Sequence, residues 1–395
     1  MTVAHSVQQA MKGTSWIRRM FEAGQALKQQ LGEDKVFDFS LGNPILEPPP
    51  AFQQALREIA DAPPPGMHRY MPNNGFLSTR RAVAAAVSEE QQLQIDADDV
   101  VMTVGAAGAL HVTLHSILDP GDEVIVLAPY FVEYLFYVDV HQGKPVVIQT
   151  TDTFDLDVDA IDAAITPRTK AIIVNTPNNP TGRIYSRDQI ASLAGVLAKH
   201  ERQHGHPIVM MFDTPYARIT YDGHRNPPLL ADHPNTVICH SHSKDLGLPG
   251  ERIGYLVISP RATHRELLRT ACMFSNRVLG FINAPAIMQL ALERSLRATV
   301  DTRDYVEART RLTRGLAAAG YSFVEPEGAF YLFPRCPTED DVAFTDALRA
   351  QNVLVVPGRG FGCPGHIRIA YCVDPDTITG ALPHFAETMR RGRGR

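Results

Sequence analysis

The sequence predicts an α/β fold: a large domain whose mostly parallel, seven-stranded sheet lies between helices, and a smaller α+β domain. Short runs rich in β-branched residues follow one another through the middle of the chain, at 100–105, 123–129, 145–150, 171–177, 207–213, 236–243 and 252–260. These runs are continuous rather than alternating, which is typical of strands buried on both faces. Helical patterns separate several of them, and strands that alternate with helices indicate a parallel sheet.

The clearest helical pattern covers residues 186–204. Ser186 stands at its start and Gln189 comes three residues later, so the two side chains can form a reciprocal capping box. We therefore expect this helix to begin at Ser186 and to connect two strands of the sheet.

The pattern changes after about residue 290. Arg- and Ala-rich helical sequence runs to Gly320, and shorter strand-like pieces follow at 322–334 and 366–372. We therefore divide the chain into three parts. An N-terminal segment, 1–48, joins the small domain and covers the site. The large domain is 49–290, and the small C-terminal domain, 291–395, starts with a long linking helix.

Composition excludes several classes of partner. The 395 residues carry a net charge of −5 with mixed signs, which argues against a nucleic-acid-binding protein. The most apolar stretch, 124–140, contains Glu133 and Asp139 and falls short of the ~18 apolar residues of a membrane span. Five cysteines without a C-x-x-C pair argue against a disulfide framework or a zinc site. With no signal-peptide core at the N-terminus, we expect a cytoplasmic protein.

Residues that could carry chemistry follow the ends of the predicted strands. In open α/β sheets, ligands bind beyond the carboxyl ends of the strands. Small residues at 105–111 open a helix there, and their backbone N–H groups either hold a phosphate or simply form a tight turn. The polar side chains at the other strand ends are Asn179, Asp213, Tyr216, Lys244 and Arg252. Each alone could be a turn residue or a surface charge, but together they converge on one edge of one sheet.

One kind of chemistry needs this set of residues. A lysine amine forms a Schiff base with an aldehyde cofactor. If that cofactor is pyridoxal phosphate, the aspartate stabilises the protonated pyridine nitrogen and makes the ring an electron sink. Backbone amides, Ser241 and Arg252 would then hold the phosphate, while Tyr216 and Asn179 would bind the ring oxygen. Lys244, once the substrate has released it, would move the α-proton as a base.

The chain resembles the pyridoxal-phosphate aminotransferases of the aspartate aminotransferase superfamily, fold type I, class I/II. The motifs run in family order over nearly the whole chain: SLGNP (40–44), YMPNNG (70–75), TVGAAGAL (103–110), DPGDEVIVLAPYF (119–131), NTPNNPTG (175–182), DTPY (213–216), SHSKDLGLPGERIGY (241–255), EGAFYLF (327–333) and HIRIAY (366–371).

The resemblance implies a role for each matching residue. Lys244 forms the cofactor Schiff base, Asp213 pairs with the pyridine nitrogen, and Tyr216 and Asn179 contact the phenolic oxygen. The implied phosphate-binding residues are Ala106 and Ala107 through their amides, with Ser241, Ser243 and Arg252. Phe131, or else its neighbour Tyr130, stacks on the cofactor ring. The substrate binds Arg368 through its α-carboxylate, and Gly42 and Asn43 lie beside it. Tyr70 reaches the phosphate of a neighbouring subunit, which implies a homodimer with shared active sites.

The sequence departs from the family at a few positions. Many relatives have Gly or Ser in place of Ala106, and Phe131 lacks the polar tip of the more usual Trp or Tyr. Trp16 or Ile17 could line the substrate pocket or pack in a core. Arg18, Arg19 and Arg277 are candidates, by region only, for binding a side-chain carboxylate.

Transfer of an amino group from an L-amino acid to a 2-oxo acid, with ping-pong kinetics, is the leading functional hypothesis. Aspartate with 2-oxoglutarate is one candidate pair, and an aromatic or neutral donor is another. A lyase, decarboxylase or oxidase that uses the same cofactor is the alternative, because the protein decides which substrate bond is broken. A non-catalytic binding domain would not need the intact catalytic set, and a dinucleotide-binding domain would need a G-x-G-x-x-G turn that GAAGAL does not supply.

Overall fold

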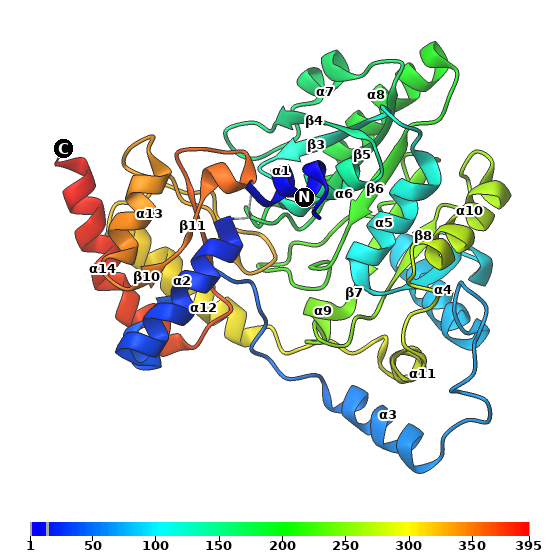
Figure 1. The fold of residues 1–395 in the computed structure, drawn as a ribbon, viewed down its shortest axis with the longest axis horizontal. Helices are drawn as coiled ribbons and strands as arrows, with labels where there is room; N and C mark the ends of the chain where they lie inside the picture. The colour runs from blue at the N-terminus through cyan, green and yellow to red at the C-terminus, as the bar shows by residue number, and fades with distance from the viewer. Residues whose placement is uncertain (1, 13–15, 395) are drawn as a thin grey trace.

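The computed structural model describes residues 2–12 and 16–394, and a seven-stranded sheet forms its centre (Figure 1). The strand order is β2-β8-β7-β6-β5-β3-β4. Only β8 runs antiparallel to its neighbours, β2 and β7, so the prediction of a mostly parallel sheet is confirmed. The strands are β2 (Val100–Thr103), β3 (Glu123–Ala128), β4 (Lys144–Gln149), β5 (Thr169–Asn175), β6 (Val209–Asp213), β7 (Thr236–Ser241) and β8 (Gly254–Ile258).

Helices cover both faces of this sheet. Ile172 and Val174 of β5 point into one core, while Ile173 between them points into the other, so residues 171–174 form a continuous apolar run. The first core is completed by α4 (Leu77–Gln91), α7 (Val158–Ala164), α8 (Arg187–His204) and α11 (Ala286–Ser295), with α3 (Pro50–Asp61) packed on α11. The second core is completed by α5 (Gly105–Ile117), α6 (Glu133–Val140) and α10 (Arg265–Val278).

Helix α8 has the predicted capping box. The Ser186 hydroxyl accepts a hydrogen bond from the Gln189 backbone N–H at 3.3 Å, and the Gln189 side chain accepts one from the Ser186 N–H at 2.9 Å. The helix ends at Gly205, whose φ of 74° is a left-handed conformation that favours glycine. Among helices within residues 2–12 and 16–394, none combines the length and apolar composition that crossing a membrane requires.

A second, smaller group of elements joins the two ends of the chain. β1 (Phe37–Asp38) pairs with β10 (Val353–Leu354), and a three-stranded sheet has the order β11-β12-β9. Figure 1 shows the blue α2 beside orange and red C-terminal elements. The remaining elements are α1 (His5–Lys12), α2 (Trp16–Leu31), η1 (Glu33–Lys35), α12 (Arg303–Ala318), β9 (Tyr331–Leu332), α13 (Asp341–Arg349), β11 (Val356–Pro357), η3 (Gly358–Phe361), β12 (Ile367–Ala370) and α14 (Pro375–Arg393).

The smaller group differs from the predicted pattern in the extent of one strand, and it also shows where the chain leaves the large domain. Only Tyr331–Leu332 of the strand-like stretch 322–334 is a strand. Pro326 has no backbone N–H for a ladder, and Gly328 lies against the Pro177 ring, so the stretch forms a loop before β9. The chain passes from the large domain to the small group between Leu296 and Val300. Leu296 packs in a core of the large sheet, whereas Val300 packs in the core of the small group. The domain boundaries at 48 and 290 remain predictions.

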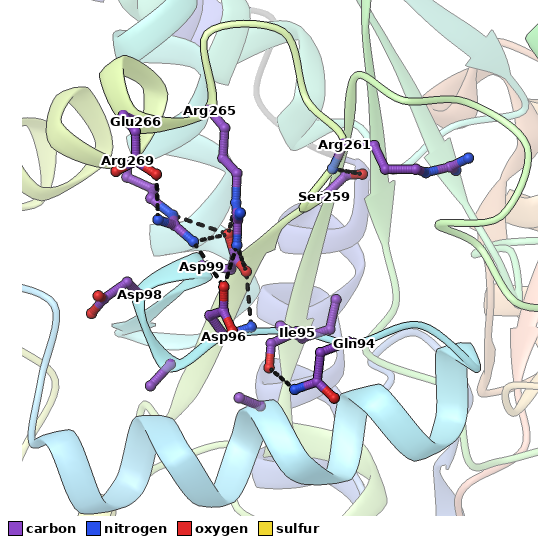
Figure 2. A network of polar contacts seen from close by, with 12 residues as sticks. Gln94, Ile95, Asp96, Asp98, Asp99, Ser259, Arg261, Arg265, Glu266 and Arg269 are labelled. Carbon is purple, nitrogen blue, oxygen red and sulfur yellow. Dashed lines mark hydrogen bonds and ion pairs between the residues drawn. The ribbon is translucent and has the colours of Figure 1, made fainter.

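A buried carboxylate fastens α10 to the start of β2. Asp99, in η2 (Ala97–Asp99), has no exposed side-chain surface and accepts hydrogen bonds from both Arg265 and Arg269 (Figure 2). Arg265 is bidentate, at 2.7 and 2.6 Å, and Arg269 contacts Oδ1 at 2.6 Å. Because the arginines compensate the buried charge, this network holds the edge of the large sheet in place.

Candidate active site

A cavity of about 330 Å³ opens at the carboxyl ends of β5, β6 and β7. Most of the predicted site residues line it: Gly42, Ala106, Ala107, Phe131, Asn179, Asp213, Tyr216, Ser241, Ser243, Lys244, Arg252 and Arg368. The lining also includes residues that the sequence analysis did not assign: Leu41, Leu110, Tyr137, Asn175, Pro215, Pro249 and Tyr331. The edge of the sheet predicted from the strand ends is therefore where the cavity lies.

Lys244 reaches the cavity from the short helix α9 (His242–Asp245), which follows β7 directly. Its Nζ donates a hydrogen bond to the Gly42 carbonyl oxygen at 2.7 Å. Burial lowers the pKa of Lys244 to about 8, and the nearby charges of Arg368 and Arg252 act in the same direction. About a tenth of this amine is therefore neutral at pH 7, far more than for an ordinary lysine, and the neutral form is the nucleophile.

Asp213 ends β6 with its side chain buried. Tyr134 of α6 donates a hydrogen bond to Oδ2, while Oδ1 has no hydrogen-bond partner among the described residues. Burial raises the pKa of Asp213 to about 6, and the Tyr134 hydroxyl opposes that rise. A buried acceptor without a partner costs about 1–3 kcal/mol, so Oδ1 suits a cationic N–H donor from a bound group. The sequence analysis did not assign a role to Tyr134. The only sequence feature that links this residue to the site is its position three residues after Phe131.

Three segments meet at the first turn of α5. Gly105 has a φ of +80°, and a Cβ there would lie 3.3 Å from Arg252 Nη2 and 3.4 Å from Ser241 Oγ. The Ser241 and Ser243 hydroxyls are 2.8 Å apart. The first backbone N–H groups of a helix have no intrahelical partner, and together with an arginine and two hydroxyls they form a site suited to a phosphate.

Arg368 is almost wholly buried, with 2% of its surface exposed. Its guanidinium donates to Asn179 Oδ1 at 3.2 Å and to the Ser40 carbonyl oxygen at 2.6 Å, while Nε has no partner among the described residues. The rings of Tyr331 and Phe361 each lie 4.8 Å from its Cζ. No carboxylate of the described chain pairs with this charge, so the arrangement suits an incoming carboxylate ligand.

Tyr331 contacts Tyr216, Gly42 and Arg368, although the sequence analysis assigned it no role. Its hydroxyl is 2.8 Å from that of Tyr216, and a Cβ on Gly42 would lie 1.9 Å from it. Glycine at position 42 is therefore required by the close approach of the tyrosine. Burial raises the pKa of Tyr216 well above its usual value, so Tyr216 stays a neutral phenol.

Several predicted residues lie away from the cavity. Tyr70 is 95% exposed, Asn43 is exposed, and Tyr130 donates its backbone N–H to Phe361 rather than lining the cavity. Arg277 and Arg19, the candidates for binding a side-chain carboxylate, do not line the cavity either. Arg277 stacks on Phe274, and Arg19 stacks on Trp16. Trp16 itself packs against Gly360. The side chains of Ile17 and Arg18 lie outside the described part of the chain.

Comparison with known proteins defines the class of enzyme. A family model described as aminotransferase class I and II matches residues 34–385, so the chain belongs to that family and is a transaminase. The aspartate/prephenate aminotransferase of Thermus thermophilus is 31% identical over 97% of this chain and 98% of its own.

Solved structures agree with this assignment. An aminotransferase from Eubacterium rectale superposes with a TM-score of 0.95 at 35% identity, over 99% of both chains. The aspartate aminotransferase of Thermus thermophilus with maleate superposes with a TM-score of 0.87 at 30% identity, over 98% of this chain and 100% of that one.

Proposed function

We propose that this transaminase uses pyridoxal 5'-phosphate and moves an amino group from an L-amino acid to a 2-oxo acid in two half-reactions. The observation that carries the proposal is that the Lys244 amine, with its lowered pKa, and the unpartnered oxygen of Asp213 line one cavity. An aldehyde needs a neutral amine, and a protonated pyridine nitrogen needs a carboxylate. When bound, this cofactor supplies an electron sink that stabilises negative charge on the substrate carbon.

The phosphate end would be held where Gly105, Ser241 and Arg252 meet. The amides of Ala106 and Ala107 open α5, Ser241 and Ser243 contribute hydroxyls, and Arg252 contributes a charge. Phe131 lines the same cavity and would pack against the face of the ring. Tyr216, as a neutral phenol, and Asn179 would hydrogen-bond the ring oxygen.

Arg368 would bind the substrate α-carboxylate through its planar fork, next to Asn179. Gly42 would let the substrate approach the backbone, with Asn43 at the rim. Lys244 would leave the Gly42 carbonyl and carry the proton to and from the substrate α-carbon, since its lowered pKa suits a general base near neutral pH. We place aspartate first among the donors because the Thermus thermophilus relative is named for it.

The second part of the proposal is a homodimer with shared active sites. Tyr70 projects fully into solvent from a loop held against α10, where Asn276 donates a hydrogen bond to the Asn73 carbonyl at 2.7 Å. The same region exposes Leu77, Phe274, Val278 and Ile282. Such a patch suits a second copy of the chain, whose active site Tyr70 would complete. A cytoplasmic location stays a prediction.

Two variants test the assignment. Lys244→Ala should abolish both turnover and the visible absorbance of the bound cofactor while the protein stays folded, with the surface variant Lys199→Ala as its control. Full activity in Lys244→Ala would end the proposal. Arg368→Ala should raise the donor KM by about 10- to 100-fold, the worth of a charged hydrogen bond. An unchanged KM would mean that another group binds the α-carboxylate.

A further inference from the structure

Three buried side chains converge next to Lys244 without lining its cavity. His240 lies near the end of β7, and His242 and Asp245 belong to α9; they are 4%, 0% and 0% exposed. His240 Nε2 is 3.4 Å from Asp245 Oδ2, and His242 Nδ1 is 3.2 Å from the same oxygen. The three atoms all lie within 4.8 Å of one another. The aminotransferase chemistry proposed above assigns them no role.

The hydrogen bonds of His240 determine which of its ring nitrogens carries the proton. Nδ1 lies 2.9 Å from the Thr214 carbonyl oxygen and 3.1 Å from the Thr214 hydroxyl. The carbonyl oxygen can only accept, and the hydroxyl can donate to the Cys239 carbonyl oxygen at 3.4 Å, so we assign the hydrogen to Nδ1. In the neutral ring, Nε2 then presents a lone pair toward the Asp245 carboxylate and has no hydrogen-bond partner among the described residues. Two acceptors facing each other repel unless a positive charge lies between them, and that charge is either a proton or a metal ion.

His242 supplies a second nitrogen to the same place. Its Nδ1 lies 3.2 Å from each oxygen of Asp245, and its Nε2 is buried without a partner in the described chain. A metal ion bound to Nδ1 would take the place of the hydrogen that Nδ1 otherwise donates to Asp245. Neutral imidazole is the form that binds transition metals.

The charges around the cluster are compatible with a bound cation. Arg218 Nη1 lies 3.8 Å from Asp245 Oδ2, but this guanidinium also pairs with Glu90 at 2.7 Å. Because Arg218 is shared between Asp245 and Glu90, this guanidinium compensates the charge of Asp245 only in part when both histidines are neutral. Arg218 also donates to the Leu296 carbonyl oxygen, so it is held by groups outside the cluster.

A second cavity provides a route to the cluster. It encloses about 380 Å³ and is lined by His240, Thr214, Arg218, Glu90 and Tyr255, among others. It shares no lining residue with the cavity that contains Lys244. This cavity therefore reaches the His240 residue by a path separate from the active site, while His242 and Asp245 do not line it.

We propose that His240, His242 and Asp245 bind one divalent transition-metal ion of the zinc class, with water from this cavity as the remaining ligand. Two of the three ligand spacings, 3.2 and 3.4 Å, match the edge of about 3.3 Å of a tetrahedron with bonds of about 2.0–2.1 Å, and the third lies within 4.8 Å. The Nδ1–H of His240 bound to the Thr214 carbonyl is the outer hydrogen bond that metal-binding histidines normally make. The ion would tie β7 to α9 and thereby fix the backbone that carries Lys244.

The test measures metal content and does not depend on activity. Tag-free holoprotein is stripped with a chelator, dialysed, incubated with micromolar Zn²⁺ and assayed by mass spectrometry for bound zinc. We expect about one tightly held ion per chain, and tetrahedral visible absorption when Co²⁺ replaces Zn²⁺. His240→Gln and His242→Asn, which keep hydrogen-bonding capacity, should each lower the retained metal roughly tenfold or more. Unchanged metal content in these variants would overturn the proposal, as would a wild-type chain that retains no zinc.

A histidine pair in α8 provides the matched control. His200 and His204 lie one turn apart in α8, within the sequence HERQH, with Nδ1 and Nε2 3.4 Å apart. Glu201 between them points inward and accepts hydrogen bonds from Ile208 and Asn235, so it is not placed as a catalytic base. His204→Ala should leave the tight ion in place. Loss of that ion in His204→Ala would assign it to the pair in α8 and overturn the proposal.

Two further measurements guard against a folding artefact. Thermal unfolding and cofactor content should show that His242→Asn is folded before its metal content is interpreted. X-ray absorption of the zinc-loaded wild-type chain needs no variant, and it should show imidazole and carboxylate ligands. A zinc ion with only one imidazole ligand would contradict the site.

Discussion

Tyr134 donates a hydrogen bond to one oxygen of Asp213 and leaves the other oxygen buried without a partner. The tyrosine comes from α6 and the aspartate from the end of β6, so the relationship exists only in the folded sheet. The hydrogen bond favours the charged form of the aspartate despite its burial, and it leaves the second oxygen able to accept another hydrogen bond.

Replacing Tyr134 with Phe should move the acid limb of the pH profile. The hydrogen bond lowers the pKa of Asp213, so its loss should raise that pKa further above about 6. The carboxylate would then be protonated at a higher pH, and the acid limb of kcat/KM should shift upward with about a tenfold loss of activity at neutral pH. Tyr321→Phe, in the small core, should not shift it. An identical profile in Tyr134→Phe would show that the hydrogen bond does not tune Asp213.

Cofactor uptake should depend on the protonation of Lys244. Only the neutral amine attacks an aldehyde, and burial lowers the pKa of Lys244 to about 8. The rate at which the cofactor-free protein takes up pyridoxal 5'-phosphate should therefore rise about tenfold per pH unit below pH ~8 and level off above it. Stopped-flow absorbance measures this rate. A rate that keeps rising toward pH ~10.5 would mean that the amine is not perturbed.

Gly42→Ala should damage the site through a steric clash. A Cβ at this position would lie 1.9 Å from the Tyr331 hydroxyl, so either the tyrosine or the backbone that accepts from Lys244 must move. We expect a loss of kcat/KM of at least about tenfold, since small displacements of positioning groups are costly. Gly195→Ala is the control, because a Cβ there meets nothing within 4 Å and helix propensity favours alanine by up to about 1 kcal/mol. Wild-type kinetics in Gly42→Ala would contradict the packing described here.

Asp99→Ala should destabilise the fold without touching the active site. It removes the buried carboxylate from Arg265 and Arg269, and breaking such a network by one partner costs about 3–5 kcal/mol. Glu89→Ala removes an exposed pair with Arg297 and should cost less than about 1 kcal/mol. Chemical denaturation monitored by circular dichroism compares the two. Equal losses would mean that the network of Figure 2 is no more stabilising than a surface ion pair.

The sequence predicted the strands well because burial on both faces leaves continuous apolar runs, as in β5 and β6. It also brought Asp213 and Lys244 to one cavity, since parallel strands end at a common edge. Tyr134, Tyr331 and the cluster at His240 could not be predicted in the same way. Their partners are distant in sequence or depend on side-chain direction at a strand end, and no local pattern records either property. The strand-like stretch 322–334 is a strand only at Tyr331–Leu332, because Pro326 and Gly328 interrupt it.

The most direct test of the central claim mixes the purified holoprotein with each of the twenty amino acids in turn, without any oxo-acid acceptor. Transamination predicts that a few donors, aspartate first among them, each release about one 2-oxo acid per active site and then stop, with a matching loss of the cofactor's visible absorbance. Release of ammonia or carbon dioxide, or continued turnover without an acceptor, would contradict transamination and indicate a lyase, decarboxylase or oxidase.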